Sequence, residues 1–349
     1  MDKSDGDGIA QHCTRRLRSY VARRSVLVLA AVVAGSVASS PARANGPLAV
    51  VDIDTGHLLY AERPHQRWHP ASLTKIMTAY LTFRAVKEGR LSFDDKIVTS
   101  KAANAMPASK IGLPVGAEMS LDLAIKSVII KSANDVSVML AEAIDGSVAA
   151  FAARMNRTAQ RLGMTRTNFV NPNGLPALRQ VTTAADLAKL TRAVLSEFPE
   201  HAHYWATPTM RIGKIRLRSH NSLLRTFPGA TGLKTGFICD SGFNVVASAK
   251  RDGRHLAAIV LGETTPQDRQ ARAAALLDHG FATYDWKVFL KAPKVDGLAA
   301  PQADPPAPSI RQSIKVWDCR RKPVRRTTPA KRKPATTSAQ TTQRPAPRS

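Results

Sequence analysis

Strand-like segments near both ends of the chain enclose a long helical stretch, and this order constrains the fold more than any other feature. Residues 48–62 alternate around a Thr55-Gly56 turn and predict a β-hairpin. Residues 231–263 predict further strands joined by tight turns. Between about 92 and 200, apolar residues recur at helical spacing. The simplest fold is an α/β (α+β) domain: an antiparallel sheet built from both ends, flanked by helices, with an inserted all-helical region.

Composition divides the chain into three regions. Residues 1–44 predict a secretory signal peptide, because a basic segment and an apolar run precede the small-residue site Ala42-Arg43-Ala44. Residues 45–291 carry the patterns of a globular catalytic body. Residues 292–349 are Pro-rich and basic and predict a largely disordered linker or tail, although 313–319 could dock on the body.

The signal peptide predicts an exported, periplasmic protein. An uncleaved anchor, the twin-arginine route and a peripheral position at the inner membrane are alternatives that the sequence leaves open. Cleavage after Ala44 would leave Cys239 and Cys319. These two could form a disulfide, or they could be one buried thiol and one tail thiol.

The formal net charge of +25 first suggests a nucleic acid or another anionic partner. Much of the excess lies outside the expected body, since residues 320–349 hold ten Lys or Arg and no acid. No basic helix is interleaved with aromatic residues, so we predict no nucleic-acid partner. No Cys or His cluster has metal-ligand spacing, so we predict no metal.

The segment HPASLTKIMTAY, residues 69–80, predicts a helix on which Ser72 and Lys75 share a face. A serine nucleophile with a lysine base needs this arrangement. Ser72 could instead simply cap the helix, because serine oxygens accept hydrogen bonds from free backbone N–H groups. The S-x-x-K motif is weak alone, so the rest of the chain must decide.

Two further triplets follow. Ser132-Ala133-Asn134 would place a hydroxyl and an amide at a helix entrance, although Ser132 alone could be a helix cap. Lys234-Thr235-Gly236 begins a strand, where the glycine would let a substrate backbone lie against the strand edge. Lys234 alone could be an exposed strand lysine. Ser219-His220-Asn221 also fits S-x-N, but Ser132 is preferred because it opens a helix of the inserted region.

In this order the three motifs resemble the set found in β-lactamases and penicillin-binding proteins. Longer segments, among them KSANDVSVMLAE, QVTTAADLAKL and GLKTGF, are similar to serine-type D-alanyl-D-alanine carboxypeptidases, the low-molecular-mass penicillin-binding proteins of peptidase family S11. The resemblance covers roughly residues 47–282. It implies a serine β-lactamase/transpeptidase-like fold and removal of the terminal D-Ala from peptidoglycan stem peptides without metal or cofactor. β-Lactams would act as covalent inhibitors.

The resemblance also implies how the catalytic groups would work. Ser72 would be the acylated nucleophile, Lys75 its general base and Ser132 a proton relay. Burial and the neighbouring Lys234 would both lower the pKa of Lys75, which a base needs because free lysine is protonated at neutral pH.

The remaining site residues would bind substrate. Asn134 would hold the substrate amide, and Lys234 and Thr235 would meet its terminal carboxylate. The backbone N–H groups of Ser72 and Phe237 would form the oxyanion hole. Arg269 falls where relatives often place a carboxylate-binding arginine, but it could equally be the exposed start of the closing helix.

Two features depart from the family pattern. Asn173 stands in NPNGL where many relatives have His, and the sequence assigns it no role. Many relatives continue into a β-rich domain and a membrane-binding amphipathic helix, which the Pro-rich segment after residue 291 does not resemble. For this basic tail we expect electrostatic contact with anionic envelope polymers.

Other functions remain as alternatives. A D,D-endopeptidase that cleaves peptidoglycan cross-links would use the same groups. A non-hydrolytic protein that binds peptidoglycan or β-lactams would not need a nucleophile with its base. A β-lactamase would need an added base, and the region before KTG has no convincing E-x-x-L-N segment.

Overall fold

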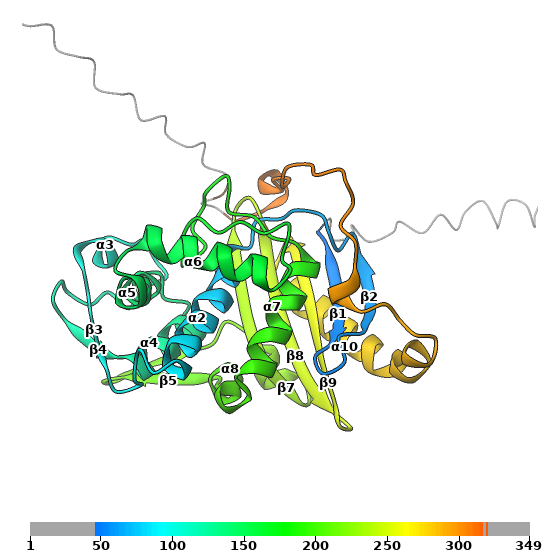
Figure 1. Ribbon diagram of the computed structural model, residues 1–349, viewed down its shortest axis with the longest axis horizontal. Helices are drawn as coiled ribbons and strands as arrows, with labels where there is room; N and C mark the ends of the chain where they lie inside the picture. Colours follow the sequence, from blue (N-terminus) through cyan, green and yellow to red (C-terminus); the bar gives the residue numbers. More distant parts are fainter. Residues whose placement is uncertain (1–45, 317–318, 320–349) are drawn as a thin grey trace, which may run out of the picture. The chain divides into compact units, whose positions relative to one another are not determined.

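The computed structural model describes residues 46–316 and residue 319 (Figure 1). A five-stranded antiparallel sheet has the order β2-β1-β9-β8-β7. Its strands are β1 (Leu48–Asp52), β2 (Leu58–Glu62), β7 (Ala230–Ile238), β8 (Gly242–Arg251) and β9 (Arg254–Glu263). The sheet therefore joins the two ends of the described chain, which confirms the predicted fold.

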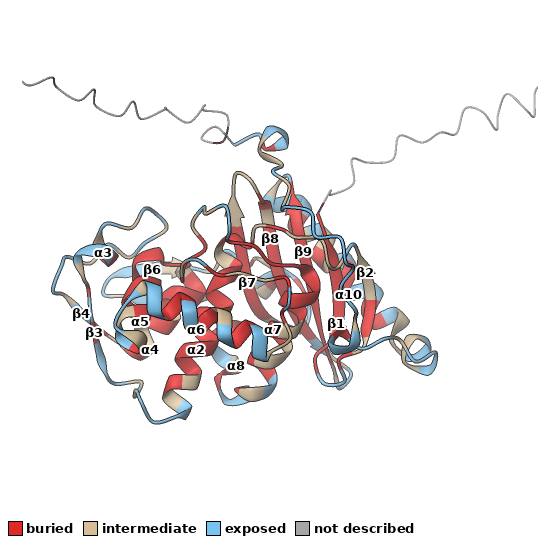
Figure 2. Ribbon diagram, turned by 45° about the horizontal axis from the view of Figure 1, so that its top comes forward, coloured by how far each residue is buried: buried red, intermediate tan, exposed pale blue. Residues whose placement is uncertain are grey.

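Both faces of this sheet are buried (Figure 2). Successive residues of a strand point to opposite faces. Leu48 and Val50 of β1 belong to the core beneath α10 (Pro266–Phe289), while Ala49 and Val51 belong to the core shared with the helical region. β7 is left at the sheet edge, where it packs against the turn that carries Ser72.

The inserted region, predicted to be all-helical, is mainly helical and also contains a pair of short strands. Several helices begin where a side-chain oxygen accepts from a backbone N–H three residues on, as Ser147 and Thr183 do at α6 and α7. Among the described residues no single helix has the length and hydropathy of a membrane span. The helices Asn134–Asp145 and Val148–Arg161 meet both criteria only when taken together, and they are bent by 82° relative to each other. The helices and turns before β7 are η1 (Ala71–Thr74), α2 (Lys75–Lys87), α3 (Lys101–Asn104), α4 (Leu121–Lys126), η2 (Ser127–Lys131), α5 (Asn134–Asp145), α6 (Val148–Arg161), α7 (Ala184–Glu197), η3 (Pro199–His201), α8 (Ala202–Ala206) and α9 (Leu223–Thr226).

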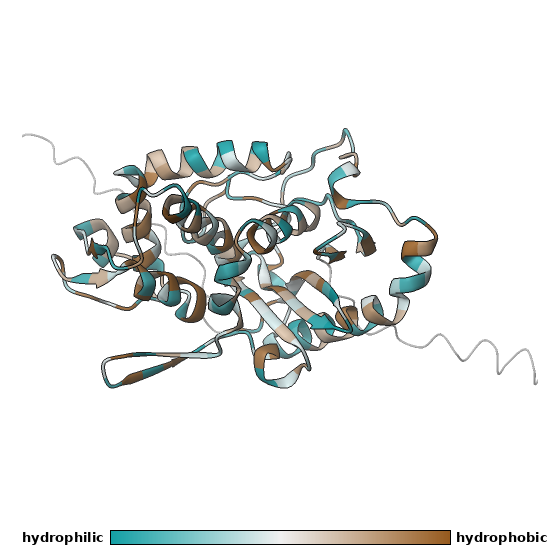
Figure 3. Ribbon diagram, turned by 60° about the horizontal axis from the view of Figure 1, so that its bottom comes forward, coloured by the Kyte–Doolittle hydropathy of each residue, from teal (hydrophilic) through white to brown (hydrophobic). Residues whose placement is uncertain are grey.

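Two short antiparallel strand pairs were not expected from the sequence. β3 (Lys96–Val98) pairs with β4 (Glu118–Ser120), and β5 (Thr209–Ile212) pairs with β6 (Ile215–Arg218). Strands of three or four residues are too short for alternation to stand out from the neighbouring helical pattern. The β5–β6 hairpin extends away from the five-stranded sheet beside the helical region (Figures 1 and 3).

The first part of the predicted disordered tail packs on the body, which corrects that prediction for residues 292–316. This strap includes η4 (Val295–Gly297) and η5 (Arg311–Ser313). Val295 is fully buried, and its N–H donates to the Gly56 carbonyl at 2.9 Å. The sequence did not predict this packing, because isolated apolar residues among prolines show no periodicity. Each such residue can still pack singly against the body. The predicted signal peptide, residues 1–44, lies outside the described residues, as do residues 45, 317–318 and 320–349.

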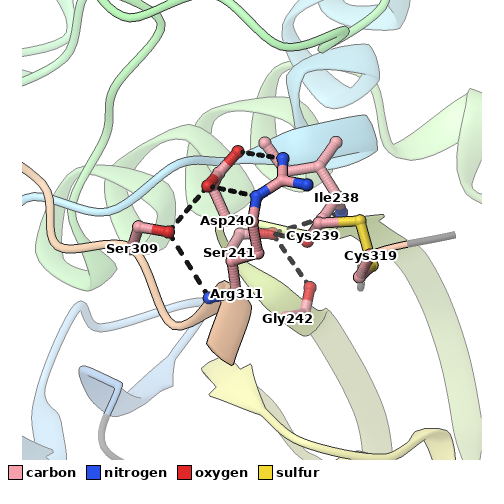
Figure 4. The surroundings of a disulfide bond; sticks show 8 residues. All are labelled: Ile238, Cys239, Asp240, Ser241, Gly242, Ser309, Arg311 and Cys319. Atoms are coloured by element: carbon pink, nitrogen blue, oxygen red, sulfur yellow. Dashed lines mark hydrogen bonds and ion pairs between the residues drawn. A yellow bond between two sulfur atoms is a disulfide. The ribbon is translucent and has the colours of Figure 1, made fainter. Parts of the chain in front are cut away.

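A disulfide fastens the end of the strap to the turn between β7 and β8 (Figure 4). Cys239 is bonded to Cys319, so the first of the two cysteine alternatives is confirmed. Beside it, Arg311 Nη2 lies 2.9 Å from Asp240 Oδ2, and the Ser309 hydroxyl donates to Asp240 Oδ1 at 2.6 Å. The strap is thus held where β7 ends, next to the edge that borders the site described below.

We predict that Cys319→Ser lowers the free energy of unfolding by about 2–4 kcal/mol, because the bridge closes a long loop in the unfolded chain. Urea unfolding with and without a reducing agent measures this. Reductant should destabilise the wild type and leave the variant unchanged. An unfolding midpoint that is the same for both oxidised proteins would contradict the prediction.

Candidate active site

Ser72 lies on a separate one-turn helix, η1, and not in the first turn of one continuous helix as the sequence predicted. Lys75 then begins α2. Neither η1 nor α2 has a side-chain cap at its start, so helix capping does not explain Ser72. Its side chain instead lines a cavity of about 610 Å³, a volume usual for ligand sites.

Two glycines let other segments pack closely against the backbone of the Ser72 turn. A Cβ on Gly236 of β7 would lie 2.9 Å from the Pro70 carbonyl oxygen and 3.0 Å from Ser72 N. A Cβ on Gly174 would lie 1.8 Å from the Ala71 carbonyl oxygen, and Gly174 has a left-handed φ of +82. The missing side chain of Gly236 thus admits the backbone of the Ser72 turn, which the sequence did not suggest. Gly236 also lines the cavity, and its contact with substrate stays a prediction.

The Lys75 amine is completely buried against Ser72. Its Nζ lies 2.9 Å from Ser72 Oγ, 2.8 Å from Asn134 Oδ1 and 2.5 Å from the Asn173 carbonyl oxygen. Asn134 Nδ2 donates to the Pro107 carbonyl at 3.0 Å, which fixes the amide so that its oxygen faces Lys75. The predicted pair of Ser72 and Lys75 is therefore in direct contact.

Burial is the main cause that lowers the pKa of Lys75 well below its ordinary value, and the Lys234 cation lowers it further against the opposing charge of Asp135. Lys234 is also buried, which together with the Arg269 cation lowers its pKa to about 7. Desolvation and a like charge both disfavour an ammonium ion. The site thus favours the neutral amine of Lys75.

The contacts of Lys75 orient that neutral amine. It has two N–H donors and one lone pair, whereas an ammonium ion has three donors and no lone pair. Asn134 Oδ1 and the Asn173 carbonyl oxygen can only accept. When Lys75 donates to both, its lone pair is left for the Ser72 hydroxyl, which is the geometry of a base.

Ser132 and Asn134 line the same cavity as Ser72. Ser132 does not open a helix: it follows η2, a π-helical turn, and α5 begins at Asn134. Ser132 has φ +63, a left-handed conformation that costs a non-glycine residue about 1–3 kcal/mol and often marks functional sites. The helix-cap alternative for Ser132 is therefore wrong.

The far wall of the cavity comes from β7, β8 and α10. Thr235, Gly236 and Phe237 of β7 line it, and Phe237 stacks on Phe243 with ring centroids 4.3 Å apart. Arg269 lines it too and is only 8% exposed, so its alternative as an exposed helix start is wrong. Lys234, at 2% exposure, is likewise not an exposed strand lysine.

Sequence reasoning missed several groups around this site. The contact from Asn173 is made by its backbone carbonyl, so the side chain that differs from many relatives is not the group that meets Lys75. His220 of the rejected S-x-N triplet also lines the cavity. Asn221 of that triplet is buried and donates to the Gly232 carbonyl at 2.9 Å.

Two buried side chains anchor the segment before Ser72 to the sheet. Trp68 Nε1 donates to the Ser241 carbonyl at 3.0 Å. Asn244 Nδ2 donates to the His69 carbonyl at 3.0 Å, and Asn244 Oδ1 accepts from Gly262 N at the same distance. A lone asparagine in the apolar strand sequence FNVVASA is the signal that could have identified this anchor.

Comparison with known sequences gives a consistent family. The family model for D-alanyl-D-alanine carboxypeptidases, peptidase family S11, matches residues 34–265. The chain is 35% identical over 242 residues to D-alanyl-D-alanine carboxypeptidase DacF of Bacillus subtilis, covering 68% of this chain and 62% of that protein. It is 34% identical over 251 residues to DacA of Haemophilus influenzae, covering 70% and 64%. The match thus spans less than two thirds of the length of these relatives.

Comparison with solved structures indicates the same family. Penicillin-binding protein 5 from Haemophilus influenzae matches with a TM-score of 0.67 at 32% identity, over 70% of this chain and 72% of that one. Penicillin-binding protein D2 from Listeria monocytogenes, in an ampicillin-bound form, matches with a TM-score of 0.63 at 32% identity, over 68% and 96%. By sequence and by fold, the chain belongs to the D-alanyl-D-alanine carboxypeptidase family of serine peptidases, peptidase family S11.

Proposed function

We propose that this protein is a serine-type D-alanyl-D-alanine carboxypeptidase that releases the terminal D-Ala from peptidoglycan stem peptides. The observation that carries the proposal is the buried Lys75 amine, whose remaining contacts leave it to act on Ser72 Oγ. The family supports the same activity, because its curated relatives are named for it.

The reaction begins with proton transfer from the Ser72 hydroxyl to neutral Lys75. Ser72 Oγ then attacks the carbonyl carbon of the scissile bond, and the backbone N–H groups of Ser72 and Phe237 stabilise the oxyanion. Protonated Lys75 returns its proton through Ser132 to the leaving amine, so that the C–N bond breaks, D-Ala departs and Lys75 is neutral again. Water hydrolyses the acyl-enzyme, again with Lys75 as base, and restores the Ser72 hydroxyl.

Substrate is held by the cavity walls. Lys234, Thr235 and Arg269 bind the terminal carboxylate, for which the two buried cations supply charge. Asn134 keeps one N–H of its amide for the substrate carbonyl while the other binds Pro107. A peptide lying along β7 would meet an edge strand, which favours an extended substrate.

β-Lactams would acylate Ser72 through the same groups, which the ampicillin-bound form of the Listeria protein supports for a relative. A D,D-endopeptidase acting on cross-links would use this chemistry as well, and D-Ala release separates the two. A non-hydrolytic binding protein is less consistent with a base aimed at a nucleophile.

The proposed location is outside the cytoplasm, in the periplasm. The Cys239–Cys319 disulfide supports an oxidising compartment. The end of α10 exposes Trp286, Phe289 and Leu290 beside Lys287, side chains that suit a membrane interface and support a peripheral position at the inner membrane. Contact of the basic tail with anionic polymers stays a prediction.

Benzylpenicillin should give the wild-type protein a single covalent adduct, because Ser72 Oγ opens the lactam ring and retains the product. Intact-mass measurement checks this. Ser72→Ala should show no adduct. Ser109→Ala is the matched control: its hydroxyl lines the same cavity but donates to the Lys131 carbonyl, and the adduct should remain.

The outcome of that experiment separates the alternatives. No adduct with intact drug would favour a binding protein, and no adduct with consumed drug would favour a β-lactamase. An adduct in Ser72→Ala would remove Ser72 as the nucleophile. If Ser72 is acylated but a D-Ala-D-Ala peptide yields no free D-Ala, the carboxypeptidase proposal fails and the endopeptidase reading takes its place.

Lys75→Ala should slow acylation by about 10²–10⁴-fold, the usual contribution of a positioned general base. Stopped-flow measurement of the acylation rate constant with a β-lactam checks this. Near-wild-type acylation in the folded variant would show that another group takes the proton.

In the pH profile of the acylation rate constant, Lys234→Gln should move the acidic limb to higher pH. The Lys234 cation lowers the pKa of Lys75, and only neutral Lys75 accepts the proton, so without that cation Lys75 stays protonated to higher pH. The rate constant for acylation measured against pH tests this, with Lys131→Gln as the control whose limb stays in place. A limb that is unmoved or lower in Lys234→Gln would contradict the assignment.

A further inference from the structure

The β5–β6 hairpin carries a basic face that the proposed reaction does not use. Its two faces are set by the pairing of Met210 with Leu217 and of Arg211 with Arg216. Met210 is buried and Leu217 packs against the core, so this pair faces the body. Arg211 and Arg216 are exposed on the opposite face. Arg218, two residues beyond Arg216, is exposed as well, and Lys214 lies in the turn.

This arrangement works against the stability of the hairpin itself. Like charges directly opposite each other on a strand pair are destabilising. Arg211 and Arg216 are such a pair. Within residues 46–316 and residue 319, no ion pair or side-chain hydrogen bond involves either of them, Lys214 or Arg218, whereas most other arginines of that part have such contacts. The repulsion is therefore not relieved by the described body.

The local sequence also contains no acidic residue that could relieve the repulsion between Arg211 and Arg216. Between Glu200 and Asp240 there is no Asp or Glu. The basic face is also continuous with the active site: Arg218 ends β6, and His220, two residues later, lines the cavity. β6 packs against η2, whose last residue directly precedes Ser132. A ligand that extends out of the cavity along this path would meet the hairpin.

We propose that the basic face of the β5–β6 hairpin, formed by Arg211, Lys214, Arg216 and Arg218, binds the anionic peptidoglycan strand to which the substrate stem peptide is attached. The proposal rests on the proposed function. Stem peptides carry free carboxylates at each repeat along the glycan, and the planar arginine fork binds carboxylates bidentately. Several weak contacts on one polymer raise its effective concentration at the cavity.

Two other polyanionic surfaces fit the hairpin less well. Its sequence, TMRIGKIRLR, has no aromatic residue on which nucleic-acid bases could stack. Ile215 is its exposed large apolar side chain, and it has no Trp or Tyr of the kind that anchors proteins at membrane interfaces. Continuity with the cavity favours the polymer that contains the substrate.

The test compares two variants with equal loss of charge. The hairpin variant neutralises the basic face, with Gln at Arg211, Lys214, Arg216 and Arg218. The control variant neutralises four exposed cations elsewhere that have no ion pair among the described residues, with Gln at Lys96, Arg157, Lys250 and Lys294. Each protein is assayed for D-Ala release from soluble uncross-linked peptidoglycan strands and from a short D-Ala-D-Ala peptide without additional carboxylates.

The hairpin variant should lose about tenfold in kcat/KM on the strands at low salt, mainly through KM, and high salt should lower the wild type to the same level. Its kcat/KM on the short peptide should be unchanged, which also shows that the variant is folded. The control variant should behave as the wild type on both. An unchanged value on the strands, or an equal loss in the control variant, would overturn the proposal.

A binding measurement separates this proposal from the proposed function. The dissociation constant for the same strands is measured in a Ser72→Ala background, with and without the hairpin substitutions. If the enzyme releases no D-Ala from either substrate, the proposed function fails, and an approximately tenfold weaker binding still supports the hairpin as a strand-binding surface. The hairpin proposal fails if the strands bind equally well with and without the substitutions. It also fails if the substitutions weaken binding to lipid vesicles or to DNA more than they weaken binding to the strands.

Discussion

The contact between the Lys75 amine and the Ser72 hydroxyl depends on removing a lysine from water. An isolated buried ammonium ion is costly, so the protein must either pair it with a carboxylate or let it lose its proton. Here the amine contacts neutral acceptors, and no carboxylate is among its hydrogen-bond partners in the described structure; burial and the Lys234 charge lower its pKa by more than the charge of Asp135 raises it. The surroundings therefore hold Lys75 in its neutral form and also orient it, and the chemistry follows from that protonation state.

The backbone around Ser72 must be held rigidly for this contact to be useful, since catalytic groups act only within narrow geometric limits. Gly174 and Gly236 allow two segments to pack directly against the backbone of the turn. Asn244 and Trp68 tie the residues before it to β8 and to the turn between β7 and β8. The same turn holds the disulfide-linked strap. Residues far apart in the sequence thus converge on one helical turn.

Much of this arrangement could be predicted from the sequence, because periodicity and short motifs report local chemistry. The hairpin at 48–62, the late strands and the pairing of Ser72 with Lys75 have such signals. The Asn173 carbonyl does not, since any residue supplies one. Nor does the strap, whose apolar residues dock singly, and the sequence left open whether Cys239 and Cys319 form a disulfide. The close approach of the Ser72 turn to Gly236 had no signal either, because a sequence does not say which backbone approaches a glycine.

The protonation state of Lys75 is the claim on which the account depends most directly. Protein labelled with ¹³C at lysine Cε can be titrated by NMR, with the Lys75 signal assigned by its loss in Lys75→Arg. The account predicts that the Lys75 Cε signal titrates at a pH well below the ordinary lysine range, because burial and the Lys234 charge lower the pKa of Lys75. A shift typical of an ammonium ion up to the ordinary lysine range near pH 10.4 would contradict it.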